Sequence, residues 1–145
     1  MFTPILSAGF HDYDEAKLEK DFLYAFPGSI TRDKLVKGLN KYINCLKAIQ
    51  IPFELWIDGS FVTNKMDPND IDLLIIASKQ KCDMLPSDKQ ALFSELINNP
   101  KAKTNFYCDV FFCVAEDEPH KSYWRGWFGF SRKELPKGIV RMKVS

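Results

Sequence analysis

Residues 55–76 have the sequence LWIDGSFVTNKMDPNDIDLLII, in which two short apolar runs lie on either side of a polar segment. The runs, Leu55–Ile57 and Leu73–Ile76, are rich in Ile and Leu and are bounded by turn residues, as buried strands are. We therefore expect one strand to end and a second strand to begin within this stretch, with the polar residues between them.

Two acids at the start of the second run, Asp70 and Asp72, are two residues apart. Because strand side chains alternate between faces, both carboxylates are expected on one face, with their Cα atoms roughly 6–7 Å apart. Such like charges repel each other, and Mg²⁺, which prefers hard oxygen ligands, would make the arrangement favourable. The alternative is a polar turn over residues 67–70, in which Asp70 caps the loop and Asp72 is an edge residue.

Gly59 and Ser60 directly follow the first run and Asp58. Glycine permits positive φ and a close approach of the backbone, and the N–H groups and hydroxyl that follow it suit an anion, as in phosphate-binding turns. Gly-Ser, nine further residues and then Asp-hydrophobic-Asp-hydrophobic form a much more specific pattern than either part alone. This pattern resembles that of the DNA polymerase beta-like nucleotidyltransferase superfamily. One position departs from it, because the residue before the glycine is usually hydrophobic and is Asp58 here.

Four stretches, spread over most of the chain, resemble one small, largely uncharacterised bacterial family of predicted nucleotidyltransferases. They are GFHDYDEAKLEKDF (9–22), TRDKLVKGLNKYI (31–43), LWIDGSFVTNKMDPNDIDLLI (55–75) and YWRGWFGFSRKELPKGIVRMKV (123–144). The resemblance implies an α/β (α+β) fold, with a nucleotidyltransferase-like short mixed β-sheet and helices packed against it. It also implies an enzyme that depends on a metal and transfers a nucleoside monophosphate from an NTP to a hydroxyl acceptor.

The superfamily takes a third acid from a later strand, next to the strand that bears the first two, and Asp109 is the matching position. Asp109 lies within YCDVFFCV, residues 107–114, a dense β-branched and aromatic run that we expect to form a central strand. A carboxylate in such a run is unfavourable to bury unless it is paired or bound to a metal. The alternative role for Asp109 is a salt bridge to Lys or Arg.

By this resemblance the catalytic and metal-binding residues are Asp70, Asp72 and Asp109. Two-metal transfer places the ions about 3.5–4 Å apart and needs shared carboxylates. Asp70 and Asp72 would bridge two Mg²⁺ ions when the NTP is bound. Asp109 would complete the ion that activates the acceptor hydroxyl, as a ligand or as the proton acceptor.

The nucleotide-binding residues implied in the same way are Gly59 and Ser60, which would hold the β- and γ-phosphates through backbone N–H groups and the Ser60 hydroxyl. Lys65 is expected to add a cation to the triphosphate, and Lys137 is the alternative. Asp58 would be an extra metal ligand or would simply fix the turn.

ATP is the favoured NTP, and the acceptor is expected to be a protein, a tRNA or a small molecule. Compact members of the superfamily include antitoxins that adenylylate a partner toxin, so a toxin–antitoxin or phage-defence setting is expected. The alternative function is a non-catalytic nucleotide- or partner-binding module that keeps the nucleotidyltransferase fold. A third alternative is an interaction domain in which the acids have no chemical role.

Composition indicates one minimal nucleotidyltransferase-like domain over residues 1–145, because 46% of the chain is hydrophobic and 14% aromatic, enough for a packed core. We divide it into an N-terminal arm and helices (1–50), a catalytic sheet core (51–115) and an aromatic segment with the last strand (116–145). With 20 basic and 19 acidic residues the net charge is +1, so no strong field attracts nucleic acid.

A cytoplasmic location without membrane contact is expected, since no run reaches the length of a membrane span and the start lacks the basic region of a signal peptide. The cysteines form no CxxC pair, so neither zinc nor a disulfide framework is expected. They are Cys45, Cys82, Cys108 and Cys113.

Hydrophobic periodicity and turn residues predict the remaining elements. Helices are expected over residues 12–26, 31–48 and 87–98, a last strand over 139–144, an extended arm over 1–12 and loops over 78–86 and 116–119. Thr31 is expected to cap the second helix, and Ser87–Gln90 has the pattern of a capping box.

Three features allow two interpretations each. The lysines of the second helix (34, 37, 41 and 47) form a solvated face or a nucleic-acid stripe, the former being favoured. The aromatic segment HKSYWRGWFGF, residues 120–130, is a structural plug or, with Arg125, a platform that stacks a base, and the plug is favoured. His11 is a turn or core residue rather than a general base.

Overall fold

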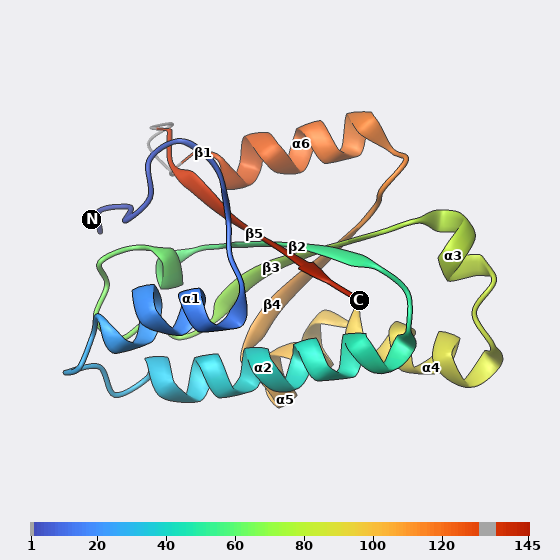
Figure 1. Ribbon diagram of the computed structural model, residues 1–145, viewed down its shortest axis with the longest axis horizontal. Coiled ribbons are helices and arrows are strands. Elements are labelled where there is room, and N and C mark those ends of the chain that lie inside the picture. Colours follow the sequence, from blue (N-terminus) through green and yellow to red (C-terminus); the bar gives the residue numbers. More distant parts are fainter. Residues whose placement is uncertain (1, 131–135) are drawn as a thin grey trace.

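A five-stranded mixed β-sheet forms the centre of the chain in the computed structural model, which describes residues 2–130 and 136–145 (Figure 1). The strands are β1 (Gly9–Asp12), β2 (Phe53–Asp58), β3 (Ile71–Ala77), β4 (Cys108–Val114) and β5 (Gly138–Val144). Their order across the sheet is β1-β5-β2-β3-β4. β1 is parallel to β5 and β3 to β4, whereas β2 is antiparallel to both of its neighbours. The predicted α/β fold with a short mixed sheet is confirmed.

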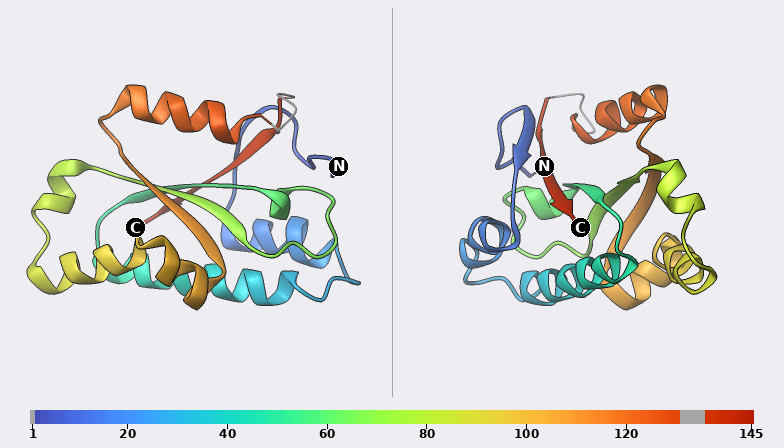
Figure 2. Two further views of the ribbon diagram at one scale, coloured as in Figure 1. Left: turned by 180° about the vertical axis from the view of Figure 1, so that it is seen from behind. Right: turned by 45° about the vertical axis from the view of Figure 1, so that its right-hand side comes forward.

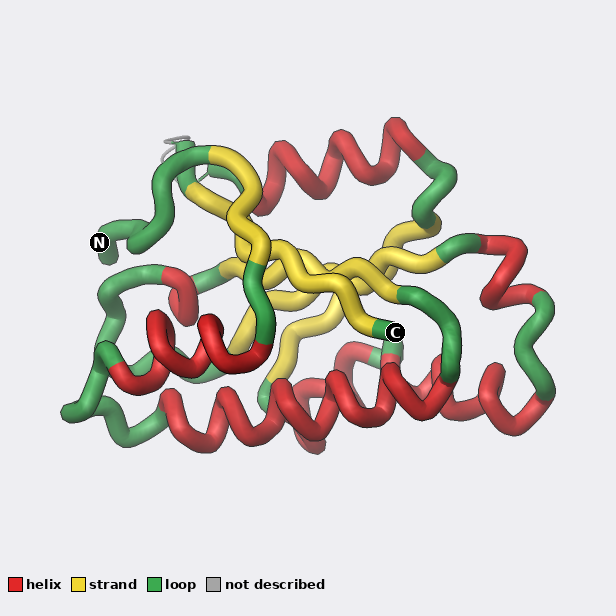
Figure 3. The backbone as a smooth tube through the Cα atoms, in the orientation of Figure 1, coloured by secondary structure: helices red, strands yellow, loops and turns green. Residues whose placement is uncertain are grey.

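Helices cover the two faces of this sheet unequally (Figures 2 and 3). They are α1 (Glu15–Glu19), α2 (Arg32–Ile49), α3 (Lys79–Asp83), α4 (Ser87–Leu96), α5 (Asn99–Phe106) and α6 (Glu118–Phe128). α2, α4 and α5 lie together on one face, and α6 is the one helix of the described residues on the other. In the described part of the chain, none of the helices combines the length and apolar character that a membrane crossing requires.

Two hydrophobic clusters, one on each face, cover β3 from Leu73 onward. Leu73 and Ile75 belong to the larger cluster under α2, and Leu74 and Ile76 belong to the smaller cluster under α6. A strand that is buried on both faces has no polar side to show, which explains the unbroken apolar run in the sequence.

The predicted second helix is confirmed as α2, and its apolar stripe faces the larger cluster. The stripe is buried throughout and consists of Leu35, Leu39, Tyr42, Ile43, Leu46 and Ile49. The four lysines of this helix are all exposed, and Lys37 pairs with Asp33 and Lys47 with Glu15, so this face is solvated as favoured.

The predicted helix starts are wrong in detail at two places. Thr31 precedes α2 but its side chain makes no capping hydrogen bond. Instead Ser29 Oγ accepts the N–H of Arg32 at 3.1 Å and that of Thr31 at 3.3 Å. At α4 the capping position is taken by Pro86, so Ser87 lies inside the helix and no capping box forms.

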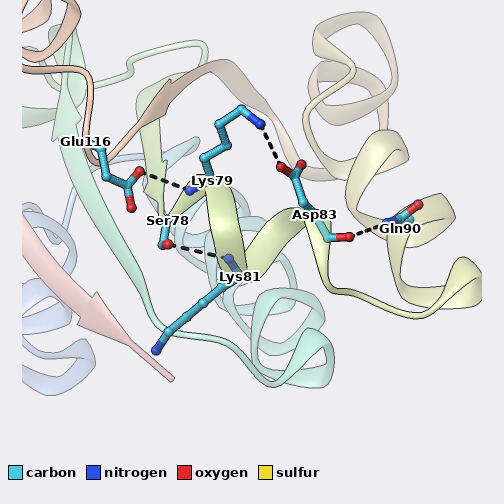
Figure 4. A network of polar contacts seen from close by, with 6 residues as sticks. All are labelled: Ser78, Lys79, Lys81, Asp83, Gln90 and Glu116. Atoms are coloured by element: carbon cyan, nitrogen blue, oxygen red, sulfur yellow. Dashed lines mark hydrogen bonds and ion pairs between the residues drawn. The ribbon is translucent and has the colours of Figure 1, made fainter.

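The predicted loop over residues 78–86 contains a short helix, α3, which the sequence does not indicate. Ser78 Oγ accepts the N–H of Lys81, and Glu116, which follows the neighbouring strand β4, accepts the N–H of Lys79 at 3.0 Å (Figure 4). Lys79 and Asp83 also form an ion pair across one turn at 2.7 Å. Polar contacts and a cap, rather than an apolar stripe, therefore define this helix, and none of its residues is fully buried.

Two further predictions are corrected near β4. No helix is predicted directly after residue 98, but α5 begins at Asn99, and Pro100 lies in its first turn, where proline is tolerated because the first N–H groups have no partner within the helix. β4 is an edge strand and not a central one. Its apolar run arises because both of its faces are covered, by the clusters under α2 and α6.

The two ends of the chain complete the sheet. The predicted last strand is confirmed as β5, but it lies between β1 and β2 inside the sheet. The expected arm includes the edge strand β1, and the expected first helix is split into α1 and a turn of π-helix over Lys20–Tyr24. The sheet thus takes strands from all three of the segments 1–50, 51–115 and 116–145. The predicted acidic turn over residues 116–119 is partly wrong, because α6 already begins at Glu118.

Candidate functional site

Three acids form a row across neighbouring strands at one end of the sheet. In the strand register Asp58 of β2 is opposite Asp72 of β3, and Asp72 is opposite Asp109 of β4. Residues paired in this way point to the same face, and neighbouring strands are about 4.8 Å apart. The predicted neighbour relation between Asp72 and Asp109 is therefore present, and Asp58 extends the row, which we call the carboxylate row.

The carboxylate row lies on the same face of the sheet as α6, next to the part of that face that α6 covers. One step further along the same face, the strands place Trp56, Leu74 and Phe111 side by side. Trp124 of α6 packs on Phe111 with ring centroids 4.8 Å apart, and Phe128 of α6 is buried in the same cluster. α6 thus closes the apolar middle of this face, and the acids come next toward the sheet end.

Asp72, the middle acid, is kept in an environment that opposes its charge. Burial, followed by the charges of Asp70 and Asp109, raises the pKa of Asp72 to about 6. Asp70 and Asp109 are the two like charges that act on Asp72. A carboxyl with a pKa shifted by burial and by specific charged neighbours is typical of a functional site.

Asp58 is the most deeply buried acid of the row. Burial raises its pKa to about 7, although the ammonium of Lys137 acts in the opposite direction. Lys137 Nζ lies 3.0 Å from Asp58 Oδ2. The sequence left the role of Asp58 open, and the structure places it in the row.

The other two acids are held by protein groups on α5. Asp109 Oδ1 accepts a hydrogen bond of 2.6 Å from the Asn99 amide, whose own oxygen accepts the N–H of Val110. Asp109 therefore has an amide partner where the alternative interpretation expected Lys or Arg. Asp70 precedes β3 and lies 3.5 Å from Lys103 Nζ, an ion pair that is partly exposed to solvent.

These side chains are not arranged as a finished metal site. Within residues 2–130 and 136–145, no three His, Cys, Asp or Glu side chains converge as a ligand set. Their chemistry does fit a hard cation, because all four acids offer oxygen ligands. One oxygen of the row, Asp58 Oδ1, is buried and has no hydrogen-bond partner among the described residues. Binding of Mg²⁺ would require the acids to turn away from their present partners.

Gly59 is required at its position for a reason other than the predicted phosphate contact. Its φ of +84° and ψ of −165° are a combination that residues with a side chain avoid. A Cβ atom on Gly59 would lie 2.6 Å from Asp72 Oδ2. The glycine therefore lets the turn pass directly beside the carboxylate of Asp72.

The loop after Gly59 is fixed by Arg32, a residue that the sequence analysis missed. The Arg32 guanidinium is fully buried and donates four hydrogen bonds of 2.7–2.9 Å to backbone carbonyls. The carbonyls belong to Phe22, Phe61, Thr63 and Lys65. The sequence shows only that Arg32 lies at the start of an amphipathic helix, and an arginine at such a position is expected to be exposed to solvent.

The predicted nucleotide-binding residues are placed as follows. Ser60 follows Gly59 in a 3₁₀ turn, and its carbonyl accepts the Thr63 hydroxyl at 2.7 Å. The Lys65 ammonium lies 5.2 Å from the centroid of the Phe2 ring, in the N-terminal arm. The cation that contacts the carboxylate row is Lys137, the alternative in the sequence analysis.

The remaining candidates have structural contacts. His11 lies in β1, and its Nε2 is 2.8 Å from the carbonyl oxygen of Ser7, which precedes that strand. In the aromatic segment Trp124 and Phe128 pack into the cluster under α6, whereas Tyr123 and Trp127 are exposed. This helix is thus a plug on its inner side. The four cysteines are free.

The fold and the carboxylate row define an α/β domain with an acidic site at one end of its sheet. Over residues 2–143 the chain matches a family described as a family of unknown function, DUF6932, and it belongs to that family. No curated protein and no solved structure matches the chain.

Proposed function

We propose that this protein is a metal-dependent nucleotidyltransferase that transfers a nucleoside monophosphate from an NTP, with ATP favoured, to a hydroxyl acceptor. The observation that supports this most is the register of β3 and β4, which aligns Asp72 with Asp109 beside the Gly59 turn. Asp72 gains nothing from this arrangement in folding, because its carboxylate is buried beside the like charges of Asp70 and Asp109. A divalent cation would turn the same arrangement into a favourable one.

The acids would have different roles in the reaction. Asp70, Asp72 and Asp109 would hold Mg²⁺, which when bound neutralises charge on the triphosphate and lowers the pKa of the acceptor hydroxyl. Asp109 is the acid whose orientation Asn99 fixes, so it is suited to receive the proton of that hydroxyl. The turn at Gly59 and Ser60 would offer backbone N–H groups and a hydroxyl to the phosphates.

The acceptor would be a protein, a tRNA or a small molecule in the cytoplasm. A toxin–antitoxin or phage-defence setting is proposed from the resemblance to compact members of the superfamily. The residues of the row do not select among these acceptors, because they act on the hydroxyl and the triphosphate alone.

The decisive experiment is transfer of label from each α-³²P NTP with Mg²⁺ to cell lysate, total tRNA or purified hydroxyl compounds. We expect a labelled product with the natural protein and none with Asp72→Asn or Asp109→Asn. Asp83→Asn is the matched control, since Asp83 is an exposed acid on α3 and should leave transfer unchanged.

Equal transfer by Asp72→Asn would refute the proposed function. The non-catalytic alternative has its own result, because an NTP that binds only the native state raises the melting temperature by mass action. A shift with Mg²⁺ and NTP but no transfer to any acceptor would support the binding module instead.

A further inference from the structure

The ion pair between Asp58 and Lys137 is the most deeply buried one in the described part of the chain. The Asp58 side chain is 3% exposed and that of Lys137 14%, whereas the Lys103–Asp70 pair is 58% and 30% exposed. Solvent screens an exposed pair almost completely and a buried pair much less. Lys137 is therefore the cation with the strongest hold on the carboxylate row.

Lys137 reaches the row from the residue directly before β5, the strand on the other side of β2 from β3. It lies two residues before Ile139, whose side chain packs with Trp56 in the cluster under α6. Side chains two apart along an extended chain point to the same face, so Lys137 shares this face with Asp58 and Asp72. The long, flexible stem of lysine allows its ammonium to leave Asp58 without any movement of the backbone.

One ammonium does not satisfy Asp58. Its Oδ2 accepts Lys137, but Oδ1 is buried and lacks a partner among the described residues. A buried carboxylate oxygen without a hydrogen bond is unfavourable, because it has lost its water partners and gained no others. A divalent cation takes several oxygen ligands at once and could use this atom together with Asp72 opposite.

We propose that Asp58 is a fourth carboxylate ligand of the cation site and that Lys137 is an internal competitor for it. Without a divalent cation the Lys137 ammonium neutralises Asp58, and when the cation binds to the row it takes over Asp58 and releases Lys137. This inference rests on the proposed function, because it assumes that the row binds a divalent cation.

The exchange follows from charge. A divalent cation near Asp72 repels the ammonium of Lys137, and both compete for the same carboxylate oxygens. The released ammonium remains close to the site, where a triphosphate would be its next anionic partner. Lys137 would thus link occupation of the cation site to nucleotide binding.

Mn²⁺ is the probe for the first test, with its affinity measured by electron paramagnetic resonance and by calorimetry at pH 8.5. Lys137→Met removes the competitor and keeps the apolar stem, so Mn²⁺ should bind at least about fivefold more tightly. Adding Asp58→Asn to Lys137→Met removes the proposed carboxylate ligand from a protein that already lacks the competing ammonium. Mn²⁺ binding should then weaken again by a similar factor. Lys143→Met, at an exposed lysine of β5, is the control and should change nothing.

The second test needs no variant. Acetylation of lysines in the natural protein, followed by mass spectrometry, should find Lys137 protected without Mg²⁺ and modified several times faster with it. Lys143 should be modified at the same rate in both conditions.

The outcomes separate the two hypotheses. If Mn²⁺ binds the natural protein and Lys137→Met equally, or if Mg²⁺ leaves Lys137 protected, the exchange is refuted while the cation site stands. If the double variant binds as tightly as Lys137→Met, Asp58 is not a ligand. If neither the natural protein nor Lys137→Met binds Mn²⁺, the proposed function fails together with the exchange.

Discussion

Replacing Asp72 by Asn should make the metal-free protein more stable at neutral pH, although it removes a residue from the centre of the candidate site. Asn has nearly the same shape as Asp but cannot ionise. The substitution therefore removes the cost of charging a carboxyl that is mostly buried and lies between Asp70 and Asp109.

The pKa of Asp72 sets the size and the sign of this effect. Burial, with the two neighbouring charges, raises the pKa from 3.8 to about 6. Between these pH values the native state keeps a proton that the unfolded chain has lost, so stability falls as the pH rises from about 4 to about 6. The full difference corresponds to roughly 3 kcal/mol at pH 7 and above. Because a carboxamide is also unfavourable to bury, we expect Asp72→Asn to gain about 1–2 kcal/mol.

Urea unfolding at several pH values between 4 and 8, with a chelator present, measures this effect. The natural protein should lose stability across this range, and Asp72→Asn should lose distinctly less. Asp83→Asn, at an exposed acid, should stay within about 0.5 kcal/mol of the natural protein. If Asp72→Asn is no more stable than the natural protein at pH 8 and has the same pH dependence, the electrostatic argument for the row is wrong.

Three further substitutions test the supports of the site. Arg32→Met leaves four buried carbonyls without their donor and should lower the free energy of unfolding by about 3–5 kcal/mol in urea; a loss below 1 kcal/mol would contradict the structural role. Gly59→Ala should be destabilised by roughly 1–3 kcal/mol and should bind Mn²⁺ more weakly, since its Cβ would displace the Asp72 carboxylate; unchanged Mn²⁺ affinity would count against that geometry. Asn99→Ala frees Asp109 and should cost about 1 kcal/mol of stability and slow label transfer, whereas transfer at the natural rate would show that Asp109 needs no fixed orientation.

The sequence predicts the elements whose side chains repeat with a clear period. β2, β3 and α2 follow from apolar runs or from a helical stripe, because burial of these side chains is what stabilises the elements. α3 and α5 are short and owe their boundaries to polar caps, Ser78 and Asn98, which resemble ordinary loop residues in a sequence. The position of β5 between β1 and β2 depends on pairing across the whole chain, and no local pattern contains it.

The candidate site, like the fold, was predictable only in part. Asp70, Asp72 and Asp109 could be proposed because the spacing of the first two and the position of the third match a family pattern. The role of Arg32 and the pairing of Lys137 with Asp58 could not, because the partners are distant in the sequence and become neighbours only through the strand order and the packing of α2. The sequence does not reveal which charged side chains are buried, because the contacts that stabilise them are made with backbone carbonyls or with a single acid that is distant in the sequence.

Two buried charged side chains show why the row, and not another polar cluster, is the candidate site. Arg32 is as deeply buried as Asp58, and its Nε also has no hydrogen-bond partner among the described residues, but its two terminal nitrogens have four carbonyl acceptors, so its burial serves the loop that it fixes. Asp58 has one partner and an orphaned oxygen, its neighbour Asp72 has a raised pKa, and Gly59 between them takes a conformation that only glycine favours. Three unfavourable features thus lie within one turn of the chain and the strand that faces it: a buried oxygen without a partner, a carboxyl with a raised pKa and a strained backbone conformation. Such a concentration of cost is typical of a site where a ligand relieves it, and we propose a cation as that ligand because four carboxylates are present.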